Sequence, residues 1–219
     1  MKLSNYKWAL LILVLHAAAV IWFATVLPAD ARVPIHWNIH NQIDGWTNRA
    51  TGLFWGLGLN AAMFLLLWLM PAYSPWFKKY RERYDRLLPS LTAILLFFFA
   101  LISVYALYVA RWGEPVGISV ILILMGFLFI FLGNLLPKVP KNFFIGIKTP
   151  WSLASDEVWD RTHRLGGLLF VLSGLLMIAK GFFLPANQPF QVVTAVIAFG
   201  MLLYPILHSF ILYKKLGKN

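Results

Sequence analysis

Long apolar runs separated by short polar connections dominate this chain. A bilayer core about 30 Å thick is crossed by roughly 20 apolar residues in a helix. In lipid the backbone must satisfy its own hydrogen bonds, so such runs form helices. The pattern therefore predicts an all-α membrane protein, a bundle of six transmembrane helices over Trp8–Leu27, Thr51–Met70, Leu91–Ala110, Val116–Leu136, Leu165–Phe183 and Gln191–Tyr213. Pro205 and the pair Gly166–Gly167 are predicted kinks or close packing points.

The first apolar run has the flanks of a secretory signal peptide, with Lys2 and Lys7 before it and Ala29-Asp30-Ala31 after it. The apolar core of a signal is about 7–15 residues long, however, and this run is about 20. We therefore expect a retained transmembrane helix.

The basic residues predict the direction of the helices. Of the 19 Lys and Arg residues, 15 lie at the termini and in the connections Pro71–Ser90 and Pro137–Arg164, and four lie in or beside the alternate connections. Cytoplasmic connections carry the excess of Lys and Arg. We therefore expect both termini inside (N-in/C-in), one long external loop over Pro28–Ala50, and one structured cytoplasmic loop over Pro137–Arg164.

Composition narrows the function classes. The chain is 60% hydrophobic and only 12% charged, whereas soluble domains are about a quarter charged. A net charge of +11 would suggest nucleic acid in a soluble protein. Here the charges lie between apolar runs, so we expect the lipid bilayer as a partner and no nucleic acid. The absence of cysteine excludes disulfides and thiolate metal sites.

No repeat, low-complexity stretch or linker divides the chain. We expect a single membrane domain over residues 1–219. Within it, an N-terminal two-helix module covers residues 1–70 and includes the external loop 28–50. A four-helix module covers residues 71–219 and includes the cytoplasmic motif 137–164.

The external loop contains two imidazoles and a carboxylate at a regular spacing. His36, His40 and Asp44 would share one face of a helix, and this set of ligands suits zinc or a similar divalent ion. Pro34, Gly45 and the neighbouring amide residues instead favour an irregular loop. On that interpretation there is no metal or other cofactor. His36, Asn38 and Asp44 then form a polar cluster, seated in the headgroup region by Trp37 and Trp46.

The cytoplasmic loop contains a predicted helix start. Ser152 is the expected N-cap, and Asp156 and Glu157 follow early enough to favour the helix dipole. The helix is expected to run through Trp159 and His163 towards the fifth span.

Asp156, Asp160 and His163 share a face of that helix by their spacing. Asp and His side chains this close could perform acid–base work or hold a metal. The alternative is an amphipathic surface helix whose carboxylates offset Arg161 and Arg164. We prefer the alternative, because no nucleophile motif or His-Glu-x-x-His run accompanies the group. The chain is therefore not expected to be an enzyme. A membrane enzyme or small transporter that uses His36/Asp44 or Asp160/His163 is the runner-up class.

One histidine is predicted inside the membrane. His16 lies near the middle of the first span, where an ionisable group is costly and often functional. The alternative is a neutral imidazole that is hydrogen-bonded to a neighbouring helix through Asn60 or a serine.

Two segments carry a family resemblance. The first consists of Pro28, Pro34, His36-Trp37-Asn38 and Asp44-Gly45. The second consists of Asn142–Leu153, then Trp159 and Thr162–Gly167. With the six spans they make the chain similar to the SdpI family of bacterial integral membrane proteins, named for the immunity protein against a sporulation-delaying toxin peptide. Lys148 stands where the family usually has Arg and Ser152 where it usually has Thr, and Lys cannot reproduce the bidentate fork of Arg.

This resemblance implies a multi-pass protein of the bacterial cytoplasmic (inner) membrane that confers resistance to a small hydrophobic toxin peptide met at the external face. A second role that it leaves open is a sensor whose cytoplasmic loops recruit a soluble regulator such as a repressor. The residues that it marks as functional are His36, Trp37, Asn38, Asp44, Asn142, Gly146, Lys148, Thr149, Pro150, Trp151, Trp159 and His163.

Overall fold

Helices make up most of the computed structural model, which describes residues 2–38, 42–113, 119–183 and 189–216. Six of these helices are long and apolar enough to cross a membrane, which confirms the predicted fold class. The elements are η1 (Leu3–Tyr6), α1 (Lys7–Val26), β1 (Arg32–Trp37), β2 (Ile43–Asn48), α2 (Arg49–Trp68), α3 (Met70–Tyr73), α4 (Arg81–Trp112), α5 (Val120–Leu135), η2 (Leu136–Lys138), α6 (Pro150–Ala154), α7 (Asp156–Phe183) and α8 (Pro189–Leu216).

The predicted connection Pro71–Ser90 is wrong in its second half, because α4 begins at Arg81 and continues through Pro89 for 32 residues. Tyr84, Leu87 and Leu88 are buried on one side of this early part. This amphipathic stripe stabilises helix well before the fully apolar run begins. The predicted start of the fourth span, Val116, lies outside the described residues.

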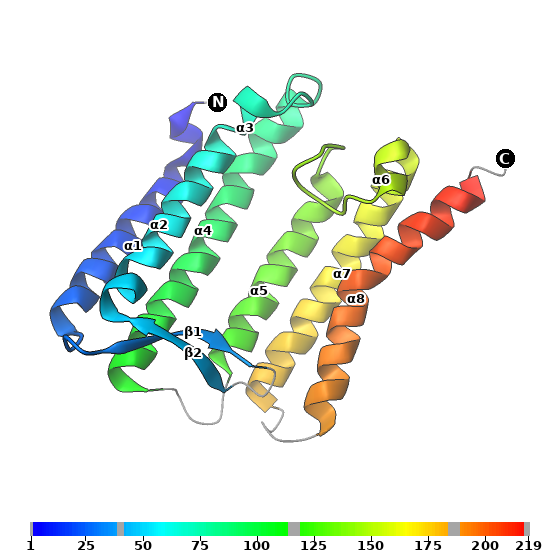
Figure 1. Cartoon of the computed structure of the whole chain (residues 1–219). Coiled ribbons are helices and arrows are strands. Elements are labelled where there is room, and N and C mark those ends of the chain that lie inside the picture. Colours follow the sequence, from blue (N-terminus) through cyan, green and yellow to red (C-terminus); the bar gives the residue numbers. More distant parts are fainter. Residues whose placement is uncertain (1, 39–41, 114–118, 184–188, 217–219) are drawn as a thin grey trace.

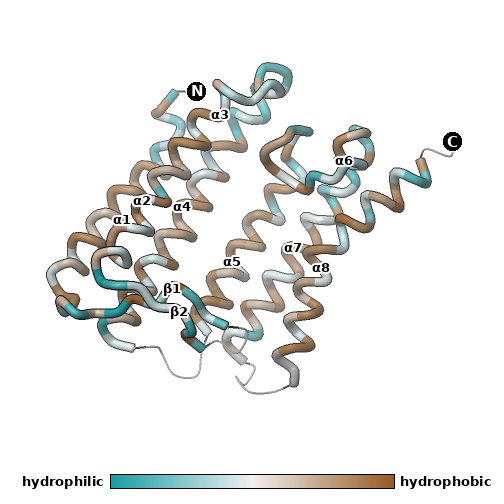
Figure 2. Tube along the Cα trace, viewed as in Figure 1, coloured by the Kyte–Doolittle hydropathy of each residue, from teal (hydrophilic) through white to brown (hydrophobic). Residues whose placement is uncertain are grey.

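The long helices run side by side, with both ends of the chain, α3 and α6 at one end of the bundle (Figure 1). The β1–β2 hairpin lies at the opposite end. Hydrophobic residues fill the middle of the helices, and hydrophilic residues gather at the two ends (Figure 2). This distribution fits a bilayer whose core meets the middle of the bundle. The direction, with both termini inside, stays a prediction from the basic residues.

The helices pack in two groups, α1 with α2 and α4, and α5 with α7 and α8, and α4 meets α5 between them. Glycines let α5 and α7 approach closely. A Cβ built on Gly126 would lie 2.5 Å from the Gly174 carbonyl oxygen, and one on Gly133 would lie 2.6 Å from that of Gly167. Gly167 is therefore a close packing point, as predicted. Pro205 lies inside α8 without ending it.

His16 is buried between α1, α2 and α4. The Asn60 amide nitrogen lies 3.0 Å from His16 Nδ1 and donates to the Leu96 carbonyl oxygen at 3.1 Å. The interhelical hydrogen bond through Asn60 is thus present, and it joins the three helices of the first group.

Candidate functional site

The loop that was predicted to be external is a β-hairpin, so both the helical and the irregular interpretation of this loop were wrong. β1 and β2 are antiparallel, with Arg32 opposite Asn48 and Trp37 opposite Ile43. Val33, Ile35 and Trp37 alternate along β1, and residues of these types favour strands. A hairpin also satisfies backbone groups that would be unpaired in a loop of this length.

The hairpin is anchored on the helices beneath it. Val33 is 1% exposed and packs over Gly52, where no side chain would fit. The ring of Trp37 stacks on Tyr105 of α4 with centroids 5.9 Å apart. A guanidinium nitrogen of Arg49 donates to the Ala24 carbonyl oxygen at 2.5 Å. The hairpin is therefore a fixed part of the fold, and Trp37 is one of its anchors.

Two members of the predicted polar cluster, His36 and Asp44, contact each other on the hairpin, and Asn38 contacts Gln42. His36 Nδ1 and an Asp44 carboxylate oxygen form an ion pair whose side chains are 67% and 45% exposed. Asn38 closes the turn, because its side-chain oxygen accepts from the Gln42 backbone N–H at 3.0 Å. His40, the third member of the predicted zinc set, lies outside the described residues. Among the described residues no three His, Cys, Asp or Glu side chains are grouped to hold a metal.

Two features of the hairpin were missed in the sequence, the exposure of Ile35 and a pocket. Ile35 is 59% exposed although it is large and apolar, and Trp46, which was predicted to lie in the headgroup region, is 42% exposed. A pocket of about 300 Å³ lies at the base of the hairpin, where Asp30, Arg32 and Arg49 join Trp46 in its wall. Ile35 shares the odd-numbered positions of β1 with Val33 and Trp37, so regular alternation would have directed it towards the buried face. Its exposure accompanies the register shift between Pro34 and His36.

The motif that was predicted to be cytoplasmic is a compact loop organised by Asn142, which is 1% exposed. Its amide nitrogen donates to the Pro140 and Ile145 carbonyl oxygens at 2.8 and 2.9 Å. Its side-chain oxygen accepts from the Phe144 and Ile145 backbone N–H groups, both at 2.7 Å. The loop then turns through Gly146, whose φ of 113° is a conformation that L side chains rarely adopt.

The helix α7 holds this loop with two stacked rings. The Trp159 indole N–H donates to the Val139 carbonyl oxygen at 2.9 Å, and the ring stacks on His163 with centroids 4.0 Å apart. The His163 Nδ1 donates to the Trp159 carbonyl oxygen at 2.8 Å, while Nε2 accepts from the Ile147 backbone N–H at 3.0 Å. Both ring nitrogens are occupied by backbone groups, which leaves neither for proton transfer with Asp160.

Ser152 was predicted to cap the helix that runs through Trp159 and His163, and this is wrong. That helix is α7, which begins at Asp156, and the Val158 backbone N–H donates to the Ser155 hydroxyl at 3.4 Å. Thr149 caps the short helix α6, and Ser152 completes a capping box from the N3 position. The Thr149 hydroxyl also lies 2.8 Å from that of Ser209 on α8. Pro150 occupies the first position of α6, which suits its missing N–H. Asp156 and Glu157 occupy the first turn of the separate helix α7, as expected.

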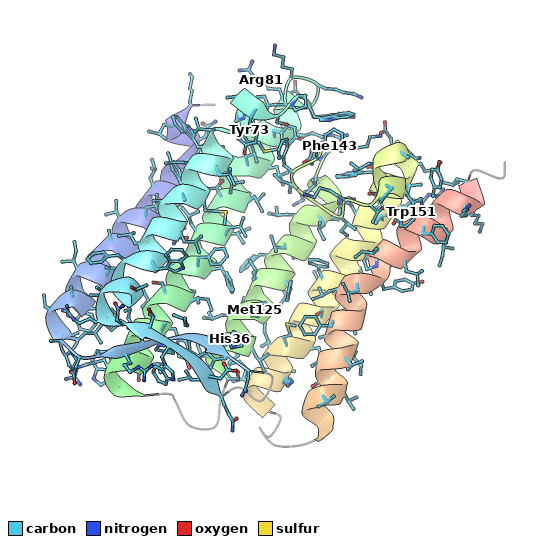
Figure 3. The ribbon with its side chains drawn as sticks, viewed as in Figure 1. His36, Tyr73, Arg81, Met125, Phe143 and Trp151 are labelled. Atoms are coloured by element: carbon cyan, nitrogen blue, oxygen red, sulfur yellow. The ribbon has the colours of Figure 1, made fainter. Side chains whose placement is uncertain are left out.

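The remaining predicted residues lie on the surface of this end. Trp151 packs at a tilt against Phe210, with centroids 4.9 Å apart. The exposed Lys148 ammonium donates to the Phe144 carbonyl oxygen at 3.1 Å. Asp156 pairs with Lys141 at 2.6 Å, so the structure does not bring Asp156, Asp160 and His163 into one polar group. Figure 3 shows Trp151 and Phe143 at one end of the bundle and His36 at the other.

Parts of this chain are similar to known proteins. Residues 138–209 match the model of the SdpI/YfhL protein family, and residues 11–60 match a domain of unknown function (DUF1648). The immunity protein SdpI of Bacillus subtilis (strain 168) is 29% identical over 106 residues, which are 48% of this chain and 50% of that protein. The match thus spans about half the length of that curated relative. No solved structure matches the chain.

Proposed function

We propose that this chain, which belongs to the SdpI family of multi-pass bacterial membrane proteins through its segment 138–209, protects a membrane against a small hydrophobic toxin peptide. The peptide meets the protein at the hairpin end of the bundle. It binds the exposed apolar side chains Ile35 and Trp46, and the His36–Asp44 pair orients it.

The observation that carries this proposal is the exposure of side chains on a firmly anchored hairpin. An exposed ion pair contributes only about 0–1 kcal/mol to stability, so His36 and Asp44 add little to the fold. Val33 and Trp37 already hold β1 on the helices. A rigid hairpin that presents apolar and charged groups outward is suited to binding, because it loses little conformational entropy when a ligand binds.

The test is survival of a sensitive bacterial host that expresses the chain, challenged with hydrophobic peptides that form pores or collapse the proton-motive force. We expect His36→Ala and Asp44→Ala each to abolish protection at unchanged membrane abundance. The matched control is the double variant Glu157→Ala with Arg161→Ala. It removes another exposed ion pair, with oxygen and nitrogen 2.5 Å apart, at the opposite end, and should protect like the parent.

Two outcomes would contradict the binding role. Equal protection per folded molecule in both hairpin variants would make the pair a structural lid. Loss of protection on addition of a chelator, with about one ion per chain by elemental analysis, would make it a metal site.

A second role is favoured by the opposite end. Phe143 and Phe144 of the motif loop are 52% and 44% exposed, and their rings contact Trp76 and Tyr73 of the preceding connection. Lys148 is exposed beside them. Aromatic side chains are enriched at protein interfaces, so this surface suits a soluble regulator in a sensing protein.

A further inference from the structure

The end of the bundle that carries α3 and α6 contains a basic cleft, away from the hairpin. Its volume is about 670 Å³. Four cationic and two acidic side chains from α4, η2 and α7 line it: Arg83, Arg86, Lys138, Arg164, Glu82 and Asp160. Within the described residues, none of the four cations forms an ion pair with a carboxylate. The cleft therefore has an excess of positive charge available to a ligand.

A second, apolar cleft of about 190 Å³ lies next to the first. Leu87 and Leu135 line both. The remainder of the apolar wall includes Leu91 of α4, Leu132 of α5 and Phe170 of α7. The two clefts therefore share part of their wall between the helix groups, and together they are called the channel, with charged side chains in one part and apolar side chains in the other.

On three sides the charged residues lie nearer the end of the helix than the apolar residues do. The change from charged to apolar side chains falls between Arg86 and Leu91 on α4, between Lys138 and Leu132 towards α5, and between Arg164 and Phe170 on α7. At 1.5 Å per residue each step is about 7–9 Å along the helix axis. A phospholipid changes from headgroup to acyl chain over a similar distance at the edge of the hydrocarbon core.

We propose that this channel binds one anionic phospholipid, with its phosphate among the four cations and an acyl chain in the apolar cleft. The excess of cations selects a negative headgroup, as basic pockets between transmembrane helices do. A free phosphate would leave the apolar part unused, and a neutral hydrocarbon would leave the cations without a counter-charge. Ile145, Gly146 and Ile147 also line the apolar cleft, so the lipid contacts the motif loop.

The test measures lipid binding to the whole chain purified in detergent, by native mass spectrometry and by the unfolding midpoint. Phosphatidylglycerol is compared with phosphatidylcholine of the same chains. The double variant Arg86→Gln with Lys138→Gln removes two cations from the wall. Its control, Arg81→Gln with Arg161→Gln, removes two cations from the same end that pair with Asp85 and Glu157 and do not line the cleft. Leu132→Trp obstructs the apolar part.

We expect the parent to retain phosphatidylglycerol, at least tenfold more tightly than phosphatidylcholine. The cleft variant and Leu132→Trp should each weaken it tenfold or more, and the control should change it less than twofold. Equal weakening by the control would overturn the proposal in favour of general surface charge. Displacement of the lipid by inorganic phosphate would overturn the proposal, because the site would then bind free anions. Equal retention of phosphatidylcholine would also overturn it, because the channel would then bind lipid chains regardless of headgroup charge.

Discussion

Single residues decide whether the motif loop can form, and Gly146 is the clearest case. Its φ of 113° lies in a region that disfavours a Cβ, and a Cβ there would collide with the His163 imidazole. The same imidazole accepts the Ile147 N–H. One glycine thus permits a close contact on which the path of the loop depends.

We therefore expect Gly146→Ala to destabilise the fold, by at least about 1 kcal/mol from the backbone conformation alone. The measurement is the thermal unfolding midpoint in detergent. Gly58→Ala is the control, because nothing lies within 4 Å of a Cβ at that helical position. A midpoint for Gly146→Ala as high as that of Gly58→Ala would contradict this explanation of the loop.

Substitution of Trp151 should affect folding, and substitution of Lys148 should affect function. Trp151 packs on Phe210, so Trp151→Ala is expected to lower the folded yield. Lys148 is exposed, so Lys148→Ala should spare yield while reducing protection about tenfold. Lys148→Arg keeps the charge and should protect like the parent. The survival assay checks both variants, and full protection by Lys148→Ala would exclude a functional role for the cation.

The structural elements differ in how far the sequence could predict them. Apolar runs of about 20 residues have one stable form in lipid, so all six spans were predictable. The hairpin was missed because Pro34 and several amide residues interrupt a short β signal. The N-cap was misplaced because Thr149, Ser152 and Ser155 can each begin a helix, and the sequence did not show that two helices, α6 and α7, start in this segment. The pairing of His36 with Asp44 was expected, whereas the binding roles of the site residues stay predictions.

Where α5 contacts α7, glycines occupy positions at which packed helices usually carry larger side chains. Gly174→Ala would place a methyl group 2.5 Å from the Gly126 carbonyl oxygen, and the helices must separate to accept it. We expect a loss of about 1–3 kcal/mol, as for other overpacked positions. The unfolding midpoint is again the measurement. Gly200→Ala, which meets nothing within 4 Å, should be neutral or slightly stabilising, and equal behaviour of the two variants would contradict the close packing.

For the whole molecule, the hairpin and α6 lie at opposite ends of the bundle (Figure 1). Because the chain has no cysteine, single cysteines can report the two sides. With the predicted direction, Ile35→Cys should react with a membrane-impermeant thiol reagent on intact cells. Ala154→Cys should react only after permeabilisation. The reverse result would invert the predicted direction, and labelling of both on intact cells would contradict a membrane-spanning bundle.

The division of the chain into modules 1–70 and 71–219 stays a prediction. The described helices associate in space as α1 with α2 and α4, and α5 with α7 and α8. α4 thus connects the two matched family segments along the chain while it packs on the first.

The two-stranded sheet also has a consequence for neighbouring copies of the protein. Open sheet edges invite pairing with strands of other chains, which leads to aggregation. Pro34 removes one backbone donor from β1, and the register of the pair shifts on both sides of His36. Such interruptions twist an edge away from regular pairing. We therefore expect that copies crowded in one membrane do not polymerise through their hairpins, so that each hairpin stays separate and open to its ligand.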